Sequence, residues 1–390
     1  MTKINFENTE VAFNIRKDSE LSWAFWMFKL ISRPGLVSMG NGVINLMAKI
    51  GIPVNWIVKP TVYKQFVGGE TIEECAPVIL KLATGNVKSI LDYSVEGRES
   101  DAEIEIAFKE TLCAIDFAGK NENIPFAVFK PTAFIKSKAI EILSLGEEKA
   151  DAESIKEGEK FRERVLKMCS KAARYDLPIL IDAEDSCYQK FIDQVVYEMQ
   201  VKFNSEKAIV YNTYQMYRWD RLDVLKKDIK RARSENFFPG VKFVRGAYME
   251  RERERAAEMN YPDPIQPDKN ATDRDYNLAL EFSLANIDRV SIFNGTHNEY
   301  SSEWMAELML KQGISPNDDR CWFSQLYGMS EHISFNLAEG GFNVAKYVPY
   351  GPVKHVLPYL TRRAEENTSV KGQTGRELSL IKKERKRRRM

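Results

Sequence analysis

Eight short runs rich in valine, isoleucine and phenylalanine alternate along the chain with longer charged stretches. Such runs are typical of buried strands, and charged stretches with apolar residues every three or four positions are typical of amphipathic helices. The runs are 89–93, 126–130, 179–182, 209–212, 241–245, 290–294, 322–326 and 344–347. Eight strands that alternate with helices predict an α/β fold, the closed parallel (β/α)8 barrel. A doubly wound sheet is the alternative, although it normally has fewer strands.

The strand pattern divides the chain into three parts. Residues 1–85 are predicted to form a mostly helical N-terminal extension, residues 86–372 the barrel, and residues 373–390 a basic C-terminal tail. The last ten residues carry seven bases and one acid, whereas the whole chain has a net charge of +1. Such a tail is typical of disordered segments that attract anionic lipid or RNA, or that only keep a protein soluble. The balanced total charge gives no reason to expect specific nucleic-acid binding.

The start of the chain and its cysteines bear on the compartment. Glu7, Glu10 and Asp18 interrupt a start that lacks the pattern of a secretory signal or of an arginine-rich transit peptide. The five cysteines form no CxxC pair, which is typical of free thiols in a reducing compartment. The apolar segments 23–31 and 46–58 are too short to span a bilayer. We therefore expect a cytoplasmic protein whose only membrane contact is peripheral, at the inner face of the membrane.

In a parallel barrel the functional site lies at the carboxyl ends of the strands, so the polar residues that end the runs are the first candidates. They are Asp92, Glu96, Lys130, Asp182, the segment 212–215, Lys242, Arg245, the segment 296–298, Gln325 and Tyr347. Lys130, Lys242 and Arg245 would bring three cations to one mouth beside Asp182. Such a mouth favours an anionic ligand or a cofactor with phosphate groups. Taken alone, each residue could instead be an ordinary loop residue or belong to an ion pair on the barrel rim.

The helix predicted after the eighth strand is amphipathic, with an apolar face that can be buried and a charged face that can bind a ligand. Tyr359, Arg362 and Arg363 fall on one face, about a third of a turn from an apolar stripe. Glu366 follows on the same face. Two adjacent guanidinium groups suit the capture of a small carboxylate, because each can donate paired hydrogen bonds to two oxygens. The alternative is a solvated surface with ordinary i,i+4 charge pairs.

Several common sites are missing from the sequence. There is no G-x-x-x-x-G-K-[ST] loop and no G-x-S-x-G elbow, and the segment 40–45 lacks the third glycine of a dinucleotide-binding turn. The three histidines are widely spaced and form no HExxH motif, so we expect no metal site. His297 follows a strand and is placed for function. We expect His332 and His355 to lie at the surface or to cap helices.

Eight short motifs follow one another along residues 66–372. They are Phe66-Val-Gly-Gly-Glu-Thr71, Leu91-Asp-Tyr-Ser-Val-Glu96-Gly97, Ile181-Asp182-Ala-Glu184, Tyr211-Asn212-Thr-Tyr-Gln215, Lys242-Phe-Val-Arg245-Gly-Ala-Tyr248, Gly295-Thr296-His297-Asn298, Gln325-Leu-Tyr-Gly-Met329 and Tyr359-Leu-Thr-Arg362-Arg363. In these motifs and in their order the chain resembles the proline dehydrogenase family, whose members are FAD-dependent (β/α)8 barrels. The shared order is far more specific than any one motif.

The resemblance implies a substrate site. Arg362 and Arg363 match arginines that bind the substrate carboxylate, and Glu96 matches an acid that pairs with the first arginine to close the site. Lys130 matches a lysine close to both flavin and substrate. The residues that match the surroundings of the proline ring are Asp182, Leu326, Tyr347 and Tyr359.

The resemblance also implies FAD as the cofactor. Lys242 matches a cation near the flavin N5. The other residues matched to the cofactor are Asn212, Arg245, Gly246, Ala247, Tyr248, Thr272, Thr296, His297, Asn298 and Gln325. Thr272 belongs to the segment 270–273, which resembles the loop and helix start over the adenosine end of the cofactor.

The reaction implied is the oxidation of L-proline to pyrroline-5-carboxylate, with hydride transfer from the proline C5 to the flavin N5 and electrons passed to a membrane quinone. The chain ends before an aldehyde dehydrogenase domain, so a separate pyrroline-5-carboxylate dehydrogenase would perform the second oxidation. Relatives specific for hydroxyproline tend to carry a smaller residue at the position of Tyr347, which favours proline as the substrate and leaves hydroxyproline as the alternative.

Two hypotheses come from other classes of protein. An aldolase-type barrel would use Lys130 or Lys242 as a Schiff-base nucleophile, which requires a desolvated, neutral lysine. That hypothesis gives the arginine pair no role. A binding protein would instead use residues 381–390 on RNA or a membrane, and the barrel mouth would then matter less than the tail.

Overall fold

The computed structural model describes residues 4–33, 35, 55–95, 97–369 and 373–390, and only the backbone of 364–369, 373 and 374. The chain forms two compact units. We call residues 1–89 with 325–390 the terminal unit, and residues 90–324 the central unit. The boundaries predicted at residues 85 and 372 remain predictions.

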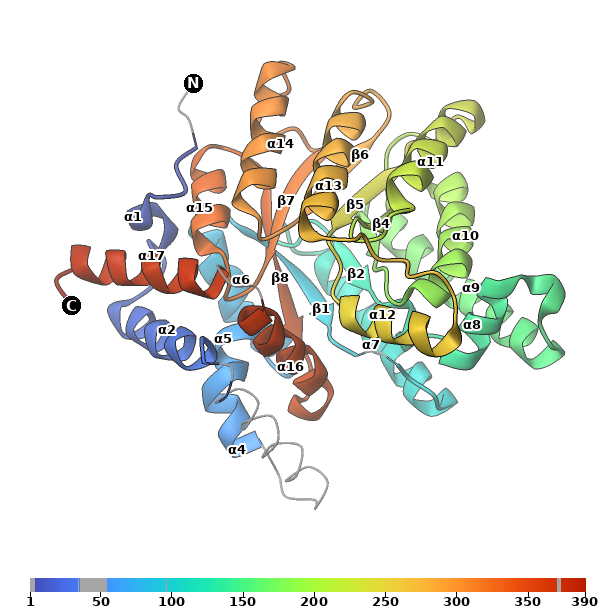
Figure 1. The fold of residues 1–390 in the computed structure, drawn as a ribbon. Helices are drawn as coiled ribbons and strands as arrows, with labels where there is room; N and C mark the ends of the chain where they lie inside the picture. The colour runs from blue at the N-terminus through green and yellow to red at the C-terminus, as the bar shows by residue number, and fades with distance from the viewer. Residues whose placement is uncertain (1–3, 34, 36–54, 96, 370–372) are drawn as a thin grey trace. The chain divides into compact units, whose positions relative to one another are not determined.

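The strands form one eight-stranded sheet (Figure 1). They are β1 (Lys88–Tyr93), β2 (Ala127–Phe129), β3 (Ile179–Ile181), β4 (Val210–Gln215), β5 (Gly240–Val244), β6 (Ser291–Gly295), β7 (Cys321–Leu326) and β8 (Val344–Tyr350). Their order is β1-β8-β7-β6-β5-β4-β3-β2, and neighbours from β2 to β7 pair in parallel. Each of the eight predicted runs is a strand. Strands that follow one another around the sheet confirm the predicted (β/α)8 barrel and exclude a doubly wound sheet.

Aromatic residues fill the amino-terminal end of the sheet in the central unit. The ring of Phe126 packs edge-on against Tyr211, Phe293 and Trp322, with ring centroids 5.0 to 5.6 Å apart. Gly240 makes room for this layer, because a Cβ there would lie 2.5 Å from the ring of Tyr211. Rings that close this end of the barrel leave the carboxyl ends of the strands for polar side chains.

Helices follow the strands of the central unit. They are α7 (Asp101–Ala118), α8 (Ser137–Leu145), α9 (Ala152–Arg174), α10 (Ser186–Phe203), α11 (Arg221–Glu235), α12 (Met249–Met259), α13 (Lys269–Leu284) and α14 (Glu299–Lys311), with the 3-10 turns η3 (Pro131–Ala133) and η4 (Glu147–Lys149). Ser100, Asp151 and Asp268 accept hydrogen bonds from backbone N–H groups of the first turns of α7, α9 and α13. Such N-caps fix where each helix begins after its loop.

The terminal unit is mostly helical outside its strands. Its helices are α1 (Thr9–Ala12), α2 (Asp18–Ile31), α4 (Asn55–Val58), α5 (Lys64–Phe66), α6 (Ala76–Ala83), α15 (Glu331–Glu339), α16 (Val353–Ser369) and α17 (Gln373–Arg387), with the π-helical turn η1 (Lys59–Tyr63) and the 3-10 turn η2 (Glu73–Cys75). The described residues before β1 hold only helices, turns and one bridge, from Gly69 to Tyr350. This confirms the mostly helical N-terminal extension.

The basic C-terminal segment is a helix, so the expected disorder is wrong. Leu380 and Ile381 of α17 are buried in a core cluster that also contains Phe28 of α2. Arg387 lies 3.3 Å from Glu10, and Arg388 lies 2.9 Å from Asp18. A buried apolar face and acidic partners from the N-terminal helices explain the order, and neither is visible in the composition of the last ten residues.

The apolar segment 46–58 lies mostly outside the described residues, as residues 46–54 are not among them. Within the described part of the chain, no helix combines the length and apolar composition needed to cross a bilayer.

Candidate active site

Four charged side chains from the carboxyl ends of strands meet in the central unit. We call Asp92, Lys130, Asp182 and Lys242 the strand-end cluster. Lys130 Nζ donates to both carboxylate oxygens of Asp92 at 2.7 Å and lies 3.7 Å from Asp182 Oδ2. Lys242 Nζ donates to Asp182 Oδ1 at 2.5 Å. The structure thus brings together three predicted site residues, Lys130, Asp182 and Lys242, and joins Asp92 to them.

Burial explains why the strand-end cluster has no net charge. Its side chains are between 5 and 15% exposed, and two carboxylates balance two ammonium groups. Charges with so little access to water require partners of opposite sign. Burial lowers the pKa of the Lys242 ammonium, and the adjacent Asp182 carboxylate opposes that change.

Asp92 and Lys130 also join the two ends of the strand order. β1 and β2 are the first and last strands of the sheet, and the ion pair connects them at their carboxyl ends. Farther along the same ends, the Gly97 N–H donates to Thr132 Oγ1 at 3.1 Å, and the Arg98 N–H donates to the Thr132 carbonyl at 3.0 Å. The pair therefore contributes to the barrel as well as to the candidate site.

Gln215 was a candidate only as part of the strand-end segment 212–215, and Glu184 only as part of a motif, so neither had a predicted role. The Glu184 carboxylate accepts from the N–H and the hydroxyl of Thr132, at 2.8 and 2.6 Å. Gln215 Nε2 donates to the Glu184 carbonyl at 2.8 Å, and Gln215 Oε1 has no hydrogen-bond donor among the described residues. Strand alternation could have identified Gln215, because it lies on the same face of β4 as Tyr211 and Thr213.

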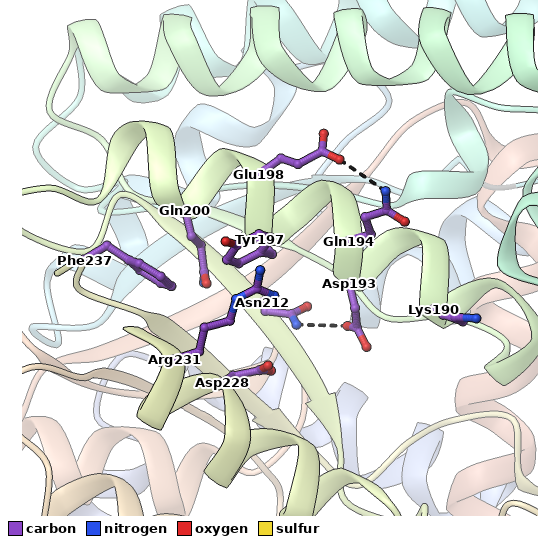
Figure 2. Close-up of a pocket in the computed structure, with 10 residues that line it drawn as sticks. All are labelled: Lys190, Asp193, Gln194, Tyr197, Glu198, Gln200, Asn212, Asp228, Arg231 and Phe237. Carbon is purple, nitrogen blue, oxygen red and sulfur yellow. Dashed lines mark hydrogen bonds between the residues drawn. The ribbon is translucent and has the colours of Figure 1, made fainter. Parts of the chain in front are cut away.

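Asn212, predicted to bind the cofactor, points to the other side of β4. Its Nδ2 donates to Asp193 Oδ1 of α10 at 2.9 Å, as Figure 2 shows. The same carboxylate lies 2.9 Å from Arg221 Nη1 of α11. Alternation along the strand sends Asn212 to the helix layer while its neighbours Tyr211 and Thr213 face inward. The orientation of Asn212 therefore does not support a cofactor contact.

A polar cavity of about 440 Å³ lies beside Asn212 in the helix layer (Figure 2). It is lined by Lys190, Asp193, Gln194, Tyr197, Glu198, Gln200, Asn212, Asp228, Arg231 and Phe237. Burial raises the pKa of Asp228 to about 6, although the hydroxyl of Tyr214 donates to it at 2.7 Å. The cavity belongs to the outer face of β4, so it is separate from the strand-end cluster.

Arg245 links the end of β5 to three later segments, namely α13, the end of β6 and α14. Its guanidinium donates to Asp273 Oδ1 at 2.8 Å, to Thr296 Oγ1 at 2.6 Å and to Ser301 Oγ at 2.9 Å. It also lies over the ring of Tyr276, 4.3 Å from the centroid. These contacts bring together the predicted cofactor residues Arg245 and Thr296.

The three predicted cations do not give the mouth an excess of positive charge. Lys130 is bonded to Asp92, Lys242 to Asp182, and Arg245 to Asp273. These three cations are therefore paired within the protein, and the anionic ligand expected at a mouth that also includes the arginine pair remains a prediction. Cations that are mostly buried in the same unit are matched by carboxylates.

The remaining predicted cofactor residues of the central unit take several positions. Gly246 has φ +127°, and a Cβ there would lie 2.5 Å from the ring of Tyr217, so the turn after β5 requires glycine. Asn298 caps α14 by accepting from the Ser301 N–H at 2.9 Å. Ala247 is exposed, Tyr248 and His297 are half-buried, and Thr272 is buried near the start of α13.

The predicted substrate residues of the terminal unit include a buried pair on α16. Arg363 is 8% exposed and its guanidinium lies 5.3 Å from the ring centroid of Tyr359, which is 6% exposed. Arg362 is half-buried, and Tyr347 on β8 is buried. The alternative that this face of the helix is a solvated charged surface is therefore wrong for Arg363. The predicted meeting of this arginine pair with the strand-end cluster remains a prediction.

Gln325 and Leu326 end β7. Gln325 Oε1 accepts from Ser334 Oγ of α15 at 2.6 Å, so its amide faces that helix. Glu96 lies outside the described residues, and so does the side chain of Glu366. The gate predicted for Glu96 remains a prediction.

His332 is buried, whereas we expected a surface or capping residue. It is 2% exposed, and its Nδ1 lies 4.0 Å from Glu377 Oε1 of α17. His355 is half-buried at the start of α16. No metal-binding group of three or more histidine, cysteine, aspartate or glutamate side chains occurs among the residues that the structure describes.

Comparison with known proteins identifies relatives along nearly the whole chain. The model of the family described as "Proline dehydrogenase" matches residues 75–376. "Proline dehydrogenase 1, mitochondrial" of Dictyostelium discoideum is 32% identical, with 98% of this chain and 74% of that protein covered. "Hydroxyproline dehydrogenase" of Xenopus laevis is 30% identical, with 96% of this chain and 88% of that protein covered.

Solved structures support the fold. A crystal structure of proline utilization A from Bdellovibrio bacteriovorus, inactivated by N-propargylglycine, superposes with a TM-score of 0.72 at 20% identity. The alignment covers 96% of this chain and 38% of that longer chain. At this identity the likeness shows the barrel fold. The family match over residues 75–376 shows more: the chain belongs to the proline dehydrogenase family of oxidoreductases.

Proposed function

We propose that the chain oxidises L-proline to pyrroline-5-carboxylate with FAD as its cofactor. The observation that carries the proposal is the strand-end cluster, in which Lys130, Asp182 and Lys242 meet within the region matched to the family. In the proposed reaction the substrate loses a hydride from C5 and a proton from nitrogen, which leaves a C=N bond. FAD, when bound, supplies the two-electron acceptor at its N5.

The residues present fit a flavin. Lys242 places a buried cation at the strand ends, and a cation there would stabilise negative charge on a reduced flavin held beside it. Gln215 Oε1 offers a buried acceptor that lacks a donor among the described residues, and an N–H of the ring could supply one. The glycine turn at Gly246, beside Arg245 and Thr296, gives backbone and cationic groups for the rest of the cofactor. These residues would hold the cofactor, together with His297.

The arginine pair of α16 is proposed to orient the substrate. Two guanidinium groups can fix both carboxylate oxygens of proline, and Tyr359 already packs beside Arg363. Lys130 is held in place by Asp92 and remains near Asp182, so it adds an ordered cation. Orientation of this kind lowers the barrier by presenting one carbon of the ring to the acceptor.

Hydroxyproline is the second candidate substrate, because the Xenopus laevis relative carries that name. We propose that Tyr347 favours proline. The side chain is buried on β8, and a bulky ring at that position would leave little space for a hydroxyl group on the substrate. A Tyr347→Ser variant should narrow the ratio of kcat/KM for L-proline over hydroxyproline, by about tenfold. An unchanged ratio would show that Tyr347 does not determine the preference for proline over hydroxyproline.

A Schiff-base aldolase is no longer supported. The chain belongs to a family of oxidoreductases, and Lys130 Nζ donates hydrogen bonds to both carboxylate oxygens of Asp92. A lysine nucleophile must be neutral.

The electron acceptor is proposed to be a membrane quinone, reached through contact of α2 with an anionic bilayer. Trp26 and Leu30 are 59 and 52% exposed, and Lys29 Nζ lies 4.7 Å from the ring centroid of Trp26. Exposed tryptophan and leucine beside lysine are typical of helices that lie at a membrane surface. A separate pyrroline-5-carboxylate dehydrogenase and a cytoplasmic address remain part of this proposal.

Sedimentation with vesicles tests the membrane contact. The protein should bind vesicles that contain phosphatidylglycerol more strongly than vesicles of phosphatidylcholine alone, and a Trp26→Ser/Leu30→Ser variant should lose most of this binding. Equal binding by the variant would exclude α2 as the contact.

The visible spectrum tests the activity. The purified protein should absorb near about 450 nm, and anaerobic L-proline should bleach this band. A colourless protein that cannot be reconstituted with FAD would contradict the proposal. A yellow protein that hydroxyproline bleaches faster than proline would make hydroxyproline the substrate.

A further inference from the structure

The turn between β7 and α15 is held by hydrogen bonds from several elements of the terminal unit. It comprises residues 327–330 and contains two positive φ values, +79° at Gly328 and +51° at Ser330. The Tyr327 N–H donates to the Tyr347 carbonyl at 2.7 Å. Gln65 Nε2 donates to the Gly328 carbonyl at 2.8 Å. A Cβ at Gly328 would lie 2.1 Å from the Gln65 carbonyl oxygen, so the two segments touch without spare room.

A buried lysine binds the turn from β8. Lys346 is 1% exposed, and its Nζ donates to the Met329 carbonyl and, at 3.4 Å, to the Leu326 carbonyl. An ammonium group shared by two carbonyls fixes the backbone on both sides of Gly328. Lys346 directly precedes Tyr347 on β8, so the two side chains point to opposite faces of the sheet.

A buried glutamate binds the turn from the C-terminal helix. Glu377 of α17 is 2% exposed, and its carboxylate accepts from the Ser330 N–H. Ser330 precedes the first residue of α15, and its own side chain makes no capping bond to that helix. The carboxylate thus lies at the positive end of α15. Burial raises the pKa of Glu377, and His332 opposes that change.

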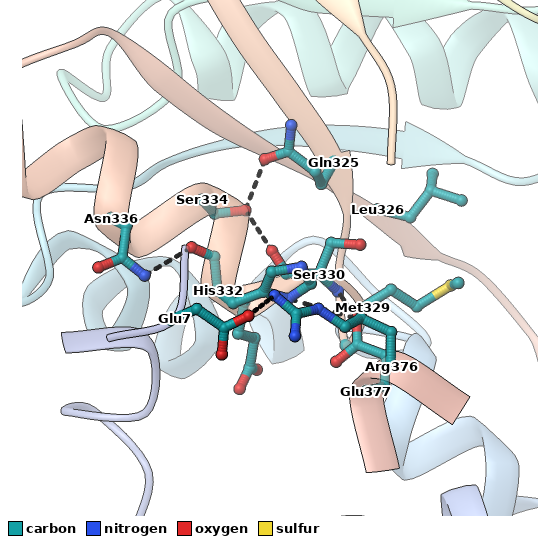
Figure 3. Close-up of polar contacts among 12 residues, drawn as sticks. Glu7, Gln325, Leu326, Met329, Ser330, His332, Ser334, Asn336, Arg376 and Glu377 are labelled. Carbon is teal, nitrogen blue, oxygen red and sulfur yellow. Dashed lines mark hydrogen bonds and ion pairs between the residues drawn. The ribbon is translucent and has the colours of Figure 1, made fainter. Parts of the chain in front are cut away.

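Figure 3 shows Glu377 beside Ser330 and His332, and Ser334 between Ser330 and Gln325. Ser334 Oγ lies 3.2 Å from the Ser330 carbonyl and donates to Gln325 at 2.6 Å. We call Gln65, Ser334, Lys346 and Glu377 the turn anchor. Its members come from α5, α15, β8 and α17, and all of them hold residues 325–330.

The turn leads directly to proposed substrate residues. Leu326 is bonded through its carbonyl to Lys346, and Met329 shares a core cluster with Tyr359 of α16 and with Leu380 of α17. The family match ends at residue 376, one residue before Glu377. Nothing in that match assigns a role to the carboxylate.

We propose that Glu377 is a positioning residue for substrate binding. Its carboxylate, with Lys346, holds the 327–330 turn so that Leu326 and Tyr359 keep their places around the substrate ring. The C-terminal helix thereby becomes part of the substrate site without touching substrate. The expected change in KM rests on the proposed function, whereas the expected loosening of the turn does not.

Two glutamates of α17 allow a matched test. Glu384 is as deeply buried as Glu377, but it binds Arg387 at the end of its own helix and Arg388 directly after it. Among the described residues it forms no hydrogen bond or ion pair with the turn. Glu377→Ala should raise KM for L-proline about tenfold while kcat changes less than about threefold. Glu377→Gln keeps an acceptor for the Ser330 N–H and should stay within about threefold of the wild type in both constants. Glu384→Ala should lower Tm yet leave KM unchanged.

Hydrogen exchange gives a readout that does not depend on activity. Peptides that cover residues 326–334 should exchange about tenfold faster in Glu377→Ala, and at the wild-type rate in Glu384→Ala. Equal acceleration in the two variants, or wild-type exchange and KM in Glu377→Ala, would overturn the inference. If the wild type itself is not bleached by L-proline, the proposed function fails, while the exchange comparison still decides whether Glu377 holds the turn.

Discussion

The strand-end cluster of the central unit and the turn anchor of the terminal unit both bury charge, but they neutralise it in different ways. In the strand-end cluster, Lys242 and Asp182 bind each other, side chain to side chain. In the turn anchor, Lys346 binds main-chain carbonyls and Glu377 binds a main-chain N–H. The first arrangement sets the places of charged groups that would face a ligand, and the second sets the path of the backbone. Each predicts a different result when one member is removed.

Loss of a charge from the strand-end cluster should have the largest effect. Lys242→Met leaves Asp182 with Lys130 at 3.7 Å as its remaining charged neighbour in the cluster. We expect the free energy of unfolding to fall by about 3 to 5 kcal/mol, because a mostly buried carboxylate loses its closest partner. Urea unfolding measures this change. In the double variant Lys242→Met/Asp182→Asn the loss should be smaller than the sum of the two single losses. Simple additivity would mean that the pair contributes no coupling.

The arginine pair on α16 should affect activity rather than stability. Arg362→Met and Arg363→Met should each lower kcat/KM for L-proline by the equivalent of about 2 to 4 kcal/mol, because each would remove a proposed charge-assisted contact to the substrate carboxylate. Flavin absorbance should stay at the wild-type level. Lys354→Met removes an exposed cation from the same helix and serves as the control. Wild-type kinetics in both arginine variants would show that Arg362 and Arg363 do not bind the substrate.

The turn anchor should make stability depend on pH through Lys346. Burial lowers its pKa from 10.5 to about 8, while Glu331 and Glu377 oppose and Arg16 assists the change. Between about pH 8 and 10.5 the unfolded state binds more protons than the folded state, so the wild type gains stability as pH rises. Relative to Lys346→Met, the gain should be about 1 to 3 kcal/mol.

Thermal unfolding of both proteins at about pH 7.5 and about pH 10 measures that gain, because these two values lie below and above the lowered pKa. A difference in Tm between the wild type and Lys346→Met that does not change with pH would show that Lys346 keeps an ordinary pKa.

The outward-facing Asn212 should have the smallest effect. Asn212→Ala removes the bond to Asp193 and should lower stability by about 1 kcal/mol, with flavin content unchanged. Gln215→Ala, on the inward face of the same strand, should lower flavin content measured by absorbance. Loss of flavin in the Asn212 variant and retention in the Gln215 variant would reverse the assignment of the two faces.

Periodicity predicted the strands well and the orientation of their side chains only in part. All eight runs became strands because each is a short apolar segment between longer helical stretches. Lys130, Asp182 and Lys242 met as expected at the strand ends. Asn212 did not join them, although alternation along β4 was available to show that Asn212 and Gln215 face opposite sides.

Pairing partners from distant parts of the chain could not be predicted. Arg245 and Asp273 are 28 residues apart. Glu377 and Ser330 are 47 residues apart. Which carboxylate neutralises which cation depends on how helices pack, and a composition or a motif contains no such distance. For the same reason the basic tail was expected to be disordered, while its acidic partners lie in the first 20 residues.

The sequence by itself determined the barrel, the family and the residues at the strand ends, because these depend on local periodicity and on motifs in a fixed order. Only the tertiary structure decided that the cations are paired, that Asn212 faces the helix layer, and that Glu377 of the last helix binds the turn after β7. These outcomes are contacts between segments far apart in the chain. They follow from the requirement that buried charges find partners, and the fold alone determines which partners are within reach.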